Sequence, residues 1–483
     1  MRMLKSLKLS AGVLALSTGA ALACSPDFTG VEITATTQTG PYIASALQLA
    51  GEEWSKKTCG TVKVVEFPWS ELYPKIVTTL SQGDSSFDVI AFAPAWAPDF
   101  TPFLTEMPAK FQEGEVWEDI APVYREQLMV WNDKVLSQTM DGDVHTYSYR
   151  IDLFEDEDNK AAFQEKYGYE LAVPKTWTEY LDIAEFFQDN VDGVYGTAEA
   201  FRRGGQQFWF LFSHVAAYAS HPDLPGAMFF DPETMDAQVN NPAWVRGLEE
   251  YIRASKLAPP SALNFSFGEV NAAFAGGQVA QSIGWGDTGV IAADPEQSTV
   301  AGNVGSGLLP SSTEVYNYKT GEWDTFDEPV DTSFMAFGGW QAAVPQSSQQ
   351  QEAAWDFIAT LSSPEVSGAA TVTGGTGVNP YRISHTTDME RWSTLFSDRE
   401  AQEYLDAQRE AVTADNVALD MRLPGYFSYT EILEIELSRA LAGEVTPQEA
   451  LDTVAAGWND LTEQFGRDSQ LAAYRASMGL PAQ

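Results

Sequence analysis

The sequence is poor in positive charge. Its 483 residues include 28 Lys and Arg against 68 Asp and Glu, which gives a formal net charge of −40. A surface this acidic repels the phosphate groups of nucleic acid and of anionic lipid. We therefore expect neither nucleic acid nor an anionic membrane surface as a partner.

Motifs for catalysis and for cofactor binding are also missing. The 4 histidines show no H-x-x-x-H spacing, and the sequence contains no G-x-S-x-G, G-x-G-x-x-G or P-loop pattern. We therefore expect no metal and no cofactor. A secreted glycosidase would need two carboxylates on opposite sides of the scissile bond, and no local motif selects such a pair. No catalytic residue is predicted, and a secreted carbohydrate-active hydrolase is kept only as an alternative.

Long apolar runs are absent beyond the N-terminus. Residues 1–23 combine a basic start, an apolar run from Leu9 to Leu22 and an A-x-A site before Cys24, which is the pattern of a cleaved export signal. The run is too short for a membrane anchor, and no later stretch approaches the ~20 apolar residues of a membrane span. We expect a signal peptide over residues 1–23 and export to the periplasm.

Cysteine is scarce, since only Cys24 and Cys59 occur. In an oxidising compartment such a pair most simply forms one disulfide, which would join the new N-terminus to the end of the first helix. The alternative is a lipid anchor on Cys24, which would leave Cys59 free. A lipid-attachment box has Leu three residues before the Cys and a small residue two before, and here Ala21 and Leu22 stand in the reverse order.

Apolar content and length, by contrast, are sufficient for two lobes. At 44% hydrophobic residues the chain can bury a large core, and 483 residues exceed what one core usually supports. Periodicity predicts alternating strands and helices at residues 31–36, 42–56, 62–67, 70–82 and 87–93, and the alternation resumes near residue 193. This pattern indicates an α/β fold with doubly wound sheets, in which ligands bind beyond the carboxyl ends of the strands.

Four parts of the chain carry a resemblance to a known family. They read FDVIAFAPAW, YRIDLF followed by PKTWTEYLDIAEFF, FGEVNAAFAGGQVAQSIGWGDTGV, and GGWQAAVPQSSQQQEAAWDFIATLSSPE. Together they resemble the family 1 extracellular solute-binding proteins of bacterial ABC importers, which include maltose-binding protein and other sugar receptors. The resemblance covers essentially the whole mature chain. It implies a periplasmic-binding-protein-like fold, in which two lobes joined by crossing strands surround a ligand cleft.

The expected lobes are each made of two chain segments. We assign residues 24–149 and 310–345 to lobe 1, and residues 150–309 and 346–483 to lobe 2. The segment 315–330, with a hairpin-like turn at its centre, is less typical of the family and is interpreted as an insertion.

The stretch from Asp331 to Pro364 organises the expected cleft. It predicts an alternating strand, a break at Gly338 and Gly339, the side chain of Trp340, a second short strand and a helix. The two glycines let a ligand approach the backbone closely, and the indole offers a flat apolar face. The alternative interpretation is that Trp340 fills a gap in the sheet core.

A sugar is bound through aromatic plates for its C–H faces and polar side chains for its hydroxyls. The candidate plates, at predicted strand-to-loop junctions, are Trp96, Trp285 and Trp340. The candidate hydroxyl acceptors are Asp99, Asp152 and Asp287, and the candidate donors are Gln38, Arg203 and Tyr381. Tryptophans inside helical patterns are expected in the core instead, and these are Trp54, Trp177, Trp209, Trp355 and Trp458.

These features together predict a periplasmic receptor. It would capture a sugar or small oligosaccharide by lobe closure, act as a monomer, and deliver the ligand to the permease subunits of an ABC transporter in the inner membrane. The main alternative is a receptor of the same fold for a non-sugar solute, such as a polyol, an opine or a sulfonate.

Overall fold

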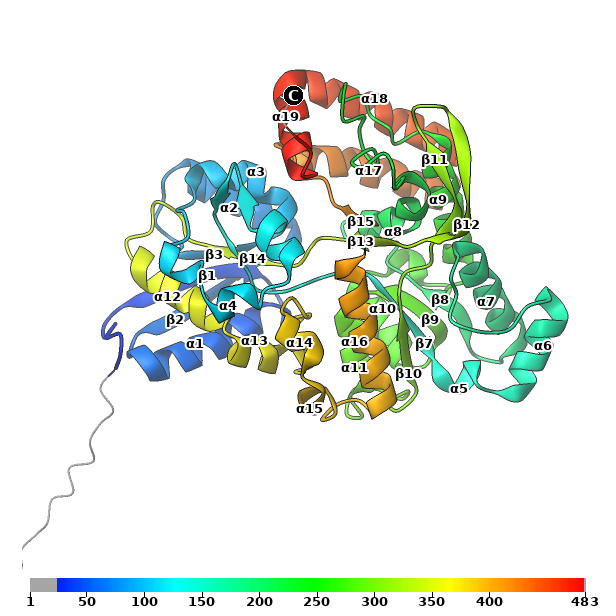
Figure 1. Cartoon of the computed structure of the whole chain (residues 1–483), viewed down its shortest axis with the longest axis horizontal. Coiled ribbons are helices and arrows are strands. Elements are labelled where there is room, and N and C mark those ends of the chain that lie inside the picture. Colours follow the sequence, from blue (N-terminus) through cyan, green and yellow to red (C-terminus); the bar gives the residue numbers. More distant parts are fainter. Residues whose placement is uncertain (1–23, 415, 482–483) are drawn as a thin grey trace, which may run out of the picture.

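Two β-sheets, each flanked by helices, form the two lobes of the molecule (Figure 1). The structure is a computed structural model and describes residues 24–414 and 416–481. Lobe 1 is built on a five-stranded sheet and lobe 2 on a four-stranded sheet. The predicted α/β fold with two lobes is confirmed. The predicted signal peptide lies outside the described residues.

The sheet of lobe 1 has the strand order β2-β1-β3-β14-β6. Its strands are β1 (Glu32–Gln38), β2 (Thr61–Phe67), β3 (Val89–Phe92), β6 (Gln138–Thr139) and β14 (Gln341–Ala343). Strands β1, β2 and β3 are parallel, as the alternation predicts, whereas β14 is antiparallel to both β3 and β6. The carboxyl ends of the parallel strands therefore share one edge of the sheet, which faces the cleft.

Helices α1 (Ala44–Thr58) and α2 (Trp69–Ser81) connect the parallel strands. Helix α1 buries Leu47, Ala50 and Trp54, which recur at helical spacing on one face. Shorter elements complete this lobe, namely α3 (Ala97–Phe100), α4 (Glu115–Glu118), β4 (Val130–Trp131) and β5 (Lys134–Val135).

Helices α12 (Gln351–Leu361) and α13 (Pro364–Thr371) also pack on α1. The indole Nε1 of Trp54 in α1 donates a hydrogen bond to Asp356 Oδ1 in α12, at 2.8 Å. These helices therefore lie with lobe 1, whereas the sequence assignment gave residues 346–483 to lobe 2. The connection from β14 to α12 is short, so the helix packs back against the sheet that it has just left.

The sheet of lobe 2 has the strand order β10-β7-β9-β8. Its strands are β7 (Thr146–Arg150), β8 (Tyr195–Ala198), β9 (Val279–Gly284) and β10 (Val304–Gly307), with β8 parallel to β9. Its helices are α5 (Ile151–Phe154), α6 (Glu157–Tyr167), α7 (Trp177–Asn190), α8 (Gln207–Ala219), α9 (Pro242–Lys256), α10 (Phe267–Ala275), α11 (Gly286–Ala293) and α16 (Asp398–Thr413). Helix α7 begins with a capping box of Thr176 and Glu179.

The less typical segment is a hairpin of β11 (Ser312–Asn317) and β12 (Glu322–Val330). Strand β11 packs on α8 and α9 of lobe 2, whereas the sequence assignment placed residues 310–345 in lobe 1. The turn residue Gly321 has φ +75°, a conformation that favours glycine. The local hairpin was predictable from this turn, but the surface that it covers was not.

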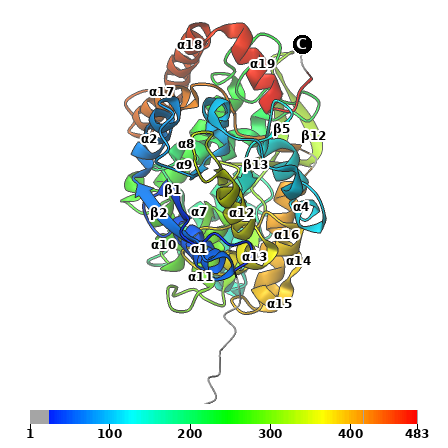
Figure 2. The same ribbon diagram turned by 90° about the vertical axis from the view of Figure 1, so that its left-hand side faces the viewer.

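Two paired strands lie between the lobes, β13 (Thr332–Met335) and β15 (Asn416–Leu419) (Figure 1). Helices α14 (Ile383–Thr387) and α15 (Met389–Trp392) lead from lobe 1 to α16. The chain ends with α17 (Tyr426–Leu441), α18 (Pro447–Phe465) and α19 (Arg467–Ser477), of which α17 and α18 pack on lobe 2 helices α8 and α9. Figure 2 shows α18 and α19 at one end of the molecule.

A disulfide joins Cys24 to Cys59, directly after α1. This confirms the predicted pairing and leaves no thiol on Cys24 for a lipid. Among the described residues, no helix is both long enough and apolar enough to cross a membrane.

Candidate functional site

Aromatic side chains from both lobes meet in the cleft. The ring centroids of Trp69 in lobe 1 and Trp209 in lobe 2 are 6.0 Å apart, and Phe337 from the segment between β13 and β14 contacts both rings. Trp96 and Trp340 extend this cluster, with centroids 5.1 and 6.0 Å from that of Trp69. The cluster separates two chambers, which we call the large and the small chamber.

The large chamber has a volume of about 360 Å³, which is within the usual range of small-molecule sites. Its walls come from both lobes and from α17, and consist of Trp69, Ser70, Trp96, Arg203, Gly204, Phe208, Trp209, Tyr426, Phe427, Thr430, Glu431 and Glu434. Burial raises the pKa of Glu434 to about 7, and the hydrogen bond from Gly204 N–H and the charge of Arg203 oppose that shift. The chamber thus offers flat apolar faces with a few polar groups.

The small chamber has a volume of only about 30 Å³. It is lined by Gln38, Tyr42, Ile43, Asp143, Gln206, Phe267, Trp285, Asp287, Phe337, Trp340 and Gly377. The indole Nε1 of Trp285 donates to Gln206 Oε1 at 3.0 Å. Tyr42 of lobe 1 meets Phe267 of lobe 2 with a centroid distance of 5.1 Å, so the two lobes are in contact here. In this closed arrangement the chamber admits only one or two groups the size of water.

Two buried aspartates, Asp143 and Asp287, line the small chamber, and a third, Asp141, lies next to them. The backbone N–H of Asn379 donates to Asp141 Oδ1 at 2.6 Å, and the Asn379 side chain donates to Asp143. Burial raises the pKa of Asp141 to about 7 and that of Asp287 to about 6. Burial and then repulsion from Asp141 raise the pKa of Asp143 well above its usual range. The cleft therefore combines aromatic faces with several oxygen acceptors.

Residues 39–367 match the sequence model of a family described as bacterial extracellular solute-binding protein. The match spans more than half of the chain and includes strands of both sheets. The chain belongs to this family. The two-lobed fold and the cleft are those that the sequence resemblance implied.

Solved structures of solute-binding proteins share this fold. A protein of Agrobacterium radiobacter in complex with ribitol is 21% identical, with a TM-score of 0.71, over 90% of this chain and 100% of that chain. A maltose-bound protein of T. maritima is 20% identical, with a TM-score of 0.71, over 89% of this chain and 100% of that chain.

A relative known from sequence is described as a probable amino-acid ABC transporter periplasmic-binding protein of Sinorhizobium fredii. It is 24% identical over 383 residues, which are 78% of this chain and 78% of the relative.

Six of the predicted site residues of this solute-binding protein line the two chambers. Gln38, Trp285, Asp287 and Trp340 line the small chamber, and Trp96 and Arg203 line the large chamber. They come from both lobes. Trp340 directly precedes β14, and the other five lie at or after the end of a strand. The structure thus brings them together, as the general rule for open α/β sheets leads one to expect.

The structure does not bring the other three predicted residues into the chambers. Asp99 accepts hydrogen bonds from Tyr73 Oη at 2.7 Å and from the N–H of Gly425 at 3.1 Å, so its acceptor capacity is used within the protein. Asp152 is in an ion pair with Arg150 in the first turn of α5. These placements correct the predicted acceptors, because each aspartate lies in a short helix after a strand and its carboxylate is bonded to partners within the protein.

Tyr381 is the third correction. It is 1% exposed and packs against His385, with ring centroids 4.9 Å apart, and lines neither chamber. Its position in a long irregular connection gave no periodicity from which its direction could be predicted.

Several lining residues were missed or assigned to the core. Trp209 was expected in the core because it lies in an apolar helix, and it is indeed fully buried, yet its ring also faces the large chamber. Trp69 lies two residues after the end of β2, and this position was the signal that could have identified it. Asp143 and Tyr42 lie in segments without a distinctive motif.

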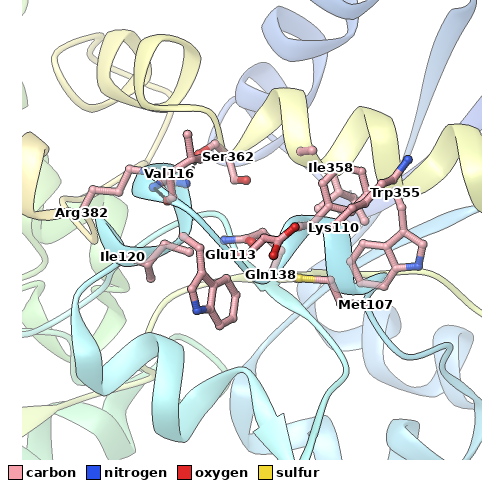
Figure 3. A pocket seen from close by; sticks show the side chains of 13 residues that line it. Met107, Lys110, Glu113, Val116, Ile120, Gln138, Trp355, Ile358, Ser362 and Arg382 are labelled. Carbon is pink, nitrogen blue, oxygen red and sulfur yellow. Dashed lines mark hydrogen bonds between the residues drawn. The ribbon is translucent and has the colours of Figure 1, made fainter. Parts of the chain in front are cut away.

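A further cavity of about 280 Å³ lies in lobe 1, beside α12 (Figure 3). Trp355 and Arg382 stand on opposite sides of it in this view. Arg382 donates to the carbonyl oxygens of Val116, at 2.6 Å, and Ser362. None of the residues that line this cavity lines either cleft chamber, so it is separate from the candidate site.

Proposed function

We propose that this protein is the receptor of an ABC importer and binds a sugar or polyol between its two lobes. The observation that carries the proposal is the aromatic cluster, which both lobes supply, next to buried carboxylates. Sugars and polyols have apolar C–H surfaces and many hydroxyl groups, so they fit aromatic faces beside oxygen acceptors. Solute-binding proteins of the same fold are described with ribitol, D-mannitol and maltose.

The receptor works by lobe closure. A ligand that contacts Trp69 and Trp209 at once binds the closed state better than the open state, and so shifts the population toward closure. The closed form is then presented to permease subunits in the inner membrane, and the chain acts in the periplasm as a monomer without catalysing a reaction. Family membership supports this role.

Small-angle X-ray scattering with and without a panel of solutes tests the proposal. The panel contains ribitol, mannitol, maltose and glucose, and we expect compaction with at least one of them. Absence of compaction with every sugar and polyol tested would refute the proposal. Chromatography of the recovered solute after hours of incubation separates a receptor, which returns its ligand unchanged, from a hydrolase.

A further inference from the structure

Asp287, which lines the small chamber, and three residues near it carry hydrogen-bond acceptors that have no partner. Within the described part of the chain, four side-chain oxygens in this region are buried and unpartnered, namely Asp141 Oδ2, Asp287 Oδ1, Asn379 Oδ1 and Gln408 Oε1. The four residues are between 0% and 7% exposed. An acceptor that is buried without a donor raises the free energy of the folded protein. A bound solute that supplies N–H or O–H groups would satisfy these acceptors and be stabilised here.

These unpartnered acceptors lie close to one another and form one cluster. Asn379 is bonded to both Asp141 and Asp143. It also packs on Gly286, where an added Cβ would lie 2.5 Å from Asn379 Oδ1, 2.8 Å from Tyr404 Oη, which is also unpartnered, and 2.9 Å from Gln408 Nε2. Gly286 directly precedes Asp287, whose carboxylate lines the small chamber. The cluster therefore joins both lobes at one wall of the chamber.

No positive side chain compensates these carboxylates. Among residues 24–414 and 416–481, those that line the small chamber include no Lys, Arg or His. The tyrosines around the aspartates remain neutral, because burial raises the pKa values of Tyr42, Tyr124 and Tyr404. His145, which packs on Trp285, is neutral as well, because burial lowers its pKa well below the usual range.

A metal ion is not the missing positive charge. Within the described residues, no group of three or more His, Cys, Asp or Glu side chains is arranged to hold one. The chamber instead presents five aromatic rings, those of Tyr42, Phe267, Trp285, Phe337 and Trp340. Aromatic faces attract organic cations such as ammonium groups, most strongly where water is excluded.

We propose that the solute carries a protonated amine as well as hydroxyl groups, as amino sugars and amino polyols do, and that the amine binds in the small chamber between Asp143 and Asp287. The volume of about 30 Å³ suits a small head group. An ammonium group supplies three donors and the positive charge that the chamber lacks. The net charge of −40 also attracts such a solute over a longer distance. This inference rests on the proposed function, since it specifies the solute class of the same cleft.

The test uses matched pairs of solutes that differ in the amine alone. Isothermal titration calorimetry at neutral pH compares sorbitol with 1-amino-1-deoxysorbitol and ribitol with 1-amino-1-deoxyribitol. Glucosamine is compared with N-acetylglucosamine, which keeps the nitrogen but loses its charge. We expect at least one amine to bind about tenfold or more tightly than its neutral partner.

Two variants assign the preference to the chamber. Asp143→Asn and Asp287→Asn each replace a carboxyl group by an amide that cannot become negatively charged, and keep the size of the side chain. Each should reduce the preference for the amine over its neutral partner to about threefold or less. Asp152→Asn, which removes an exposed carboxylate outside both chambers, should leave the preference unchanged. Melting temperatures of all variants show that they are folded.

The outcomes separate this inference from the proposed function. Neutral solutes that bind and compact the protein as tightly as their amines would overturn the inference and keep the sugar or polyol receptor. If Asp143→Asn and Asp287→Asn both keep the full preference for the amine, the assignment of the amine to the small chamber is wrong. Absence of binding by every member of every pair would count against the inference and the receptor function together.

Discussion

Tyr42 and Phe267 meet edge-on across the cleft, with ring centroids 5.1 Å apart and an interplanar angle of 70°. Tyr42 precedes α1 of lobe 1, and Phe267 is the first residue of α10 of lobe 2. Their contact belongs to the closed arrangement of the lobes, because it requires the two sheets to approach each other. Substitution of either residue should therefore alter the balance between the open and the closed arrangement of the lobes.

The first prediction is that Phe267→Ala shifts the ligand-free protein toward the open state. An aromatic pair of this geometry contributes about 0.5 to 1.5 kcal/mol beyond its buried area, so the closed population should fall about two- to tenfold. The radius of gyration from small-angle scattering should increase. Tyr318→Ala, which changes an aromatic residue outside both chambers, is the control. An unchanged radius for Phe267→Ala would mean that this contact does not hold the lobes together.

The second prediction concerns Trp340. Trp340→Ala removes a flat apolar wall of the small chamber and should weaken solute binding by about 1.5 to 3 kcal/mol, which is roughly ten- to more than a hundredfold. The stability of the ligand-free protein should decrease less than in Trp458→Ala. Trp458 is fully buried in α18, far from both chambers, and its loss should cost about 3 to 5 kcal/mol.

Calorimetric titration and urea unfolding of both tryptophan variants check this prediction. A Trp340→Ala protein that unfolds early yet binds its solute normally once folded would remove Trp340 from the site. It would then be a core residue, which is the alternative that the sequence left open.

The third prediction is that stability decreases as pH rises from about 4 to about 8. The pKa values of Asp141 and Asp287 are raised to about 7 and about 6 in the fold, from an ordinary value of 3.8 for an aspartate side chain. Between the unfolded and folded pKa values the native state binds more protons than the unfolded state, so lowering the pH stabilises the fold. The full effect, on the order of 7 kcal/mol at about 1.4 kcal/mol per pKa unit, is present below the unfolded value and is lost above about pH 7.

Urea unfolding of the ligand-free protein at several pH values measures this slope. The overall negative charge gives a slope of the same sign, so the variants decide its origin. Asp141→Asn combined with Asp287→Asn should flatten the slope, whereas Asp152→Asn should not. Equal slopes in the two variants would show that the cleft carboxylates titrate normally.

The fourth prediction is that the mature protein contains no free thiol. Intact mass analysis should show two hydrogens fewer than the reduced chain, because Cys24 and Cys59 are joined. Cys59→Ser should destabilise the protein by about 2 to 4 kcal/mol, since the bond closes a loop with a sequence separation of 35. Reduction should destabilise the unmodified protein by a similar amount and leave Cys59→Ser unaffected. A diacylglycerol mass on Cys24 would contradict the prediction.

Local sequence patterns determined the elements of this protein and their order. The alternation of period-2 and period-3.6 segments predicted β1, α1, β2, α2 and β3 within a few residues. The strand, double-glycine break and helix around Trp340 were predicted in the same way, and Gly338 and Gly339 do adopt positive φ of 74° and 80°. Each of these features is determined by residues that are close together in the chain, so it can be predicted from the local sequence.

Tertiary structure alone decided which side chains face one another across the cleft. Trp69 and Trp209 are 140 positions apart in sequence and become neighbours only when the two lobes close. Asp99 and Asp152 have a carboxylate and a position after a strand, as ligand contacts often do. In the structure, however, Asp99 accepts a hydrogen bond from Tyr73 and Asp152 forms an ion pair with Arg150. The cluster of Asp141, Asp143 and Asp287 has no motif, because long-range packing buries these carboxylates together and so sets their charge state.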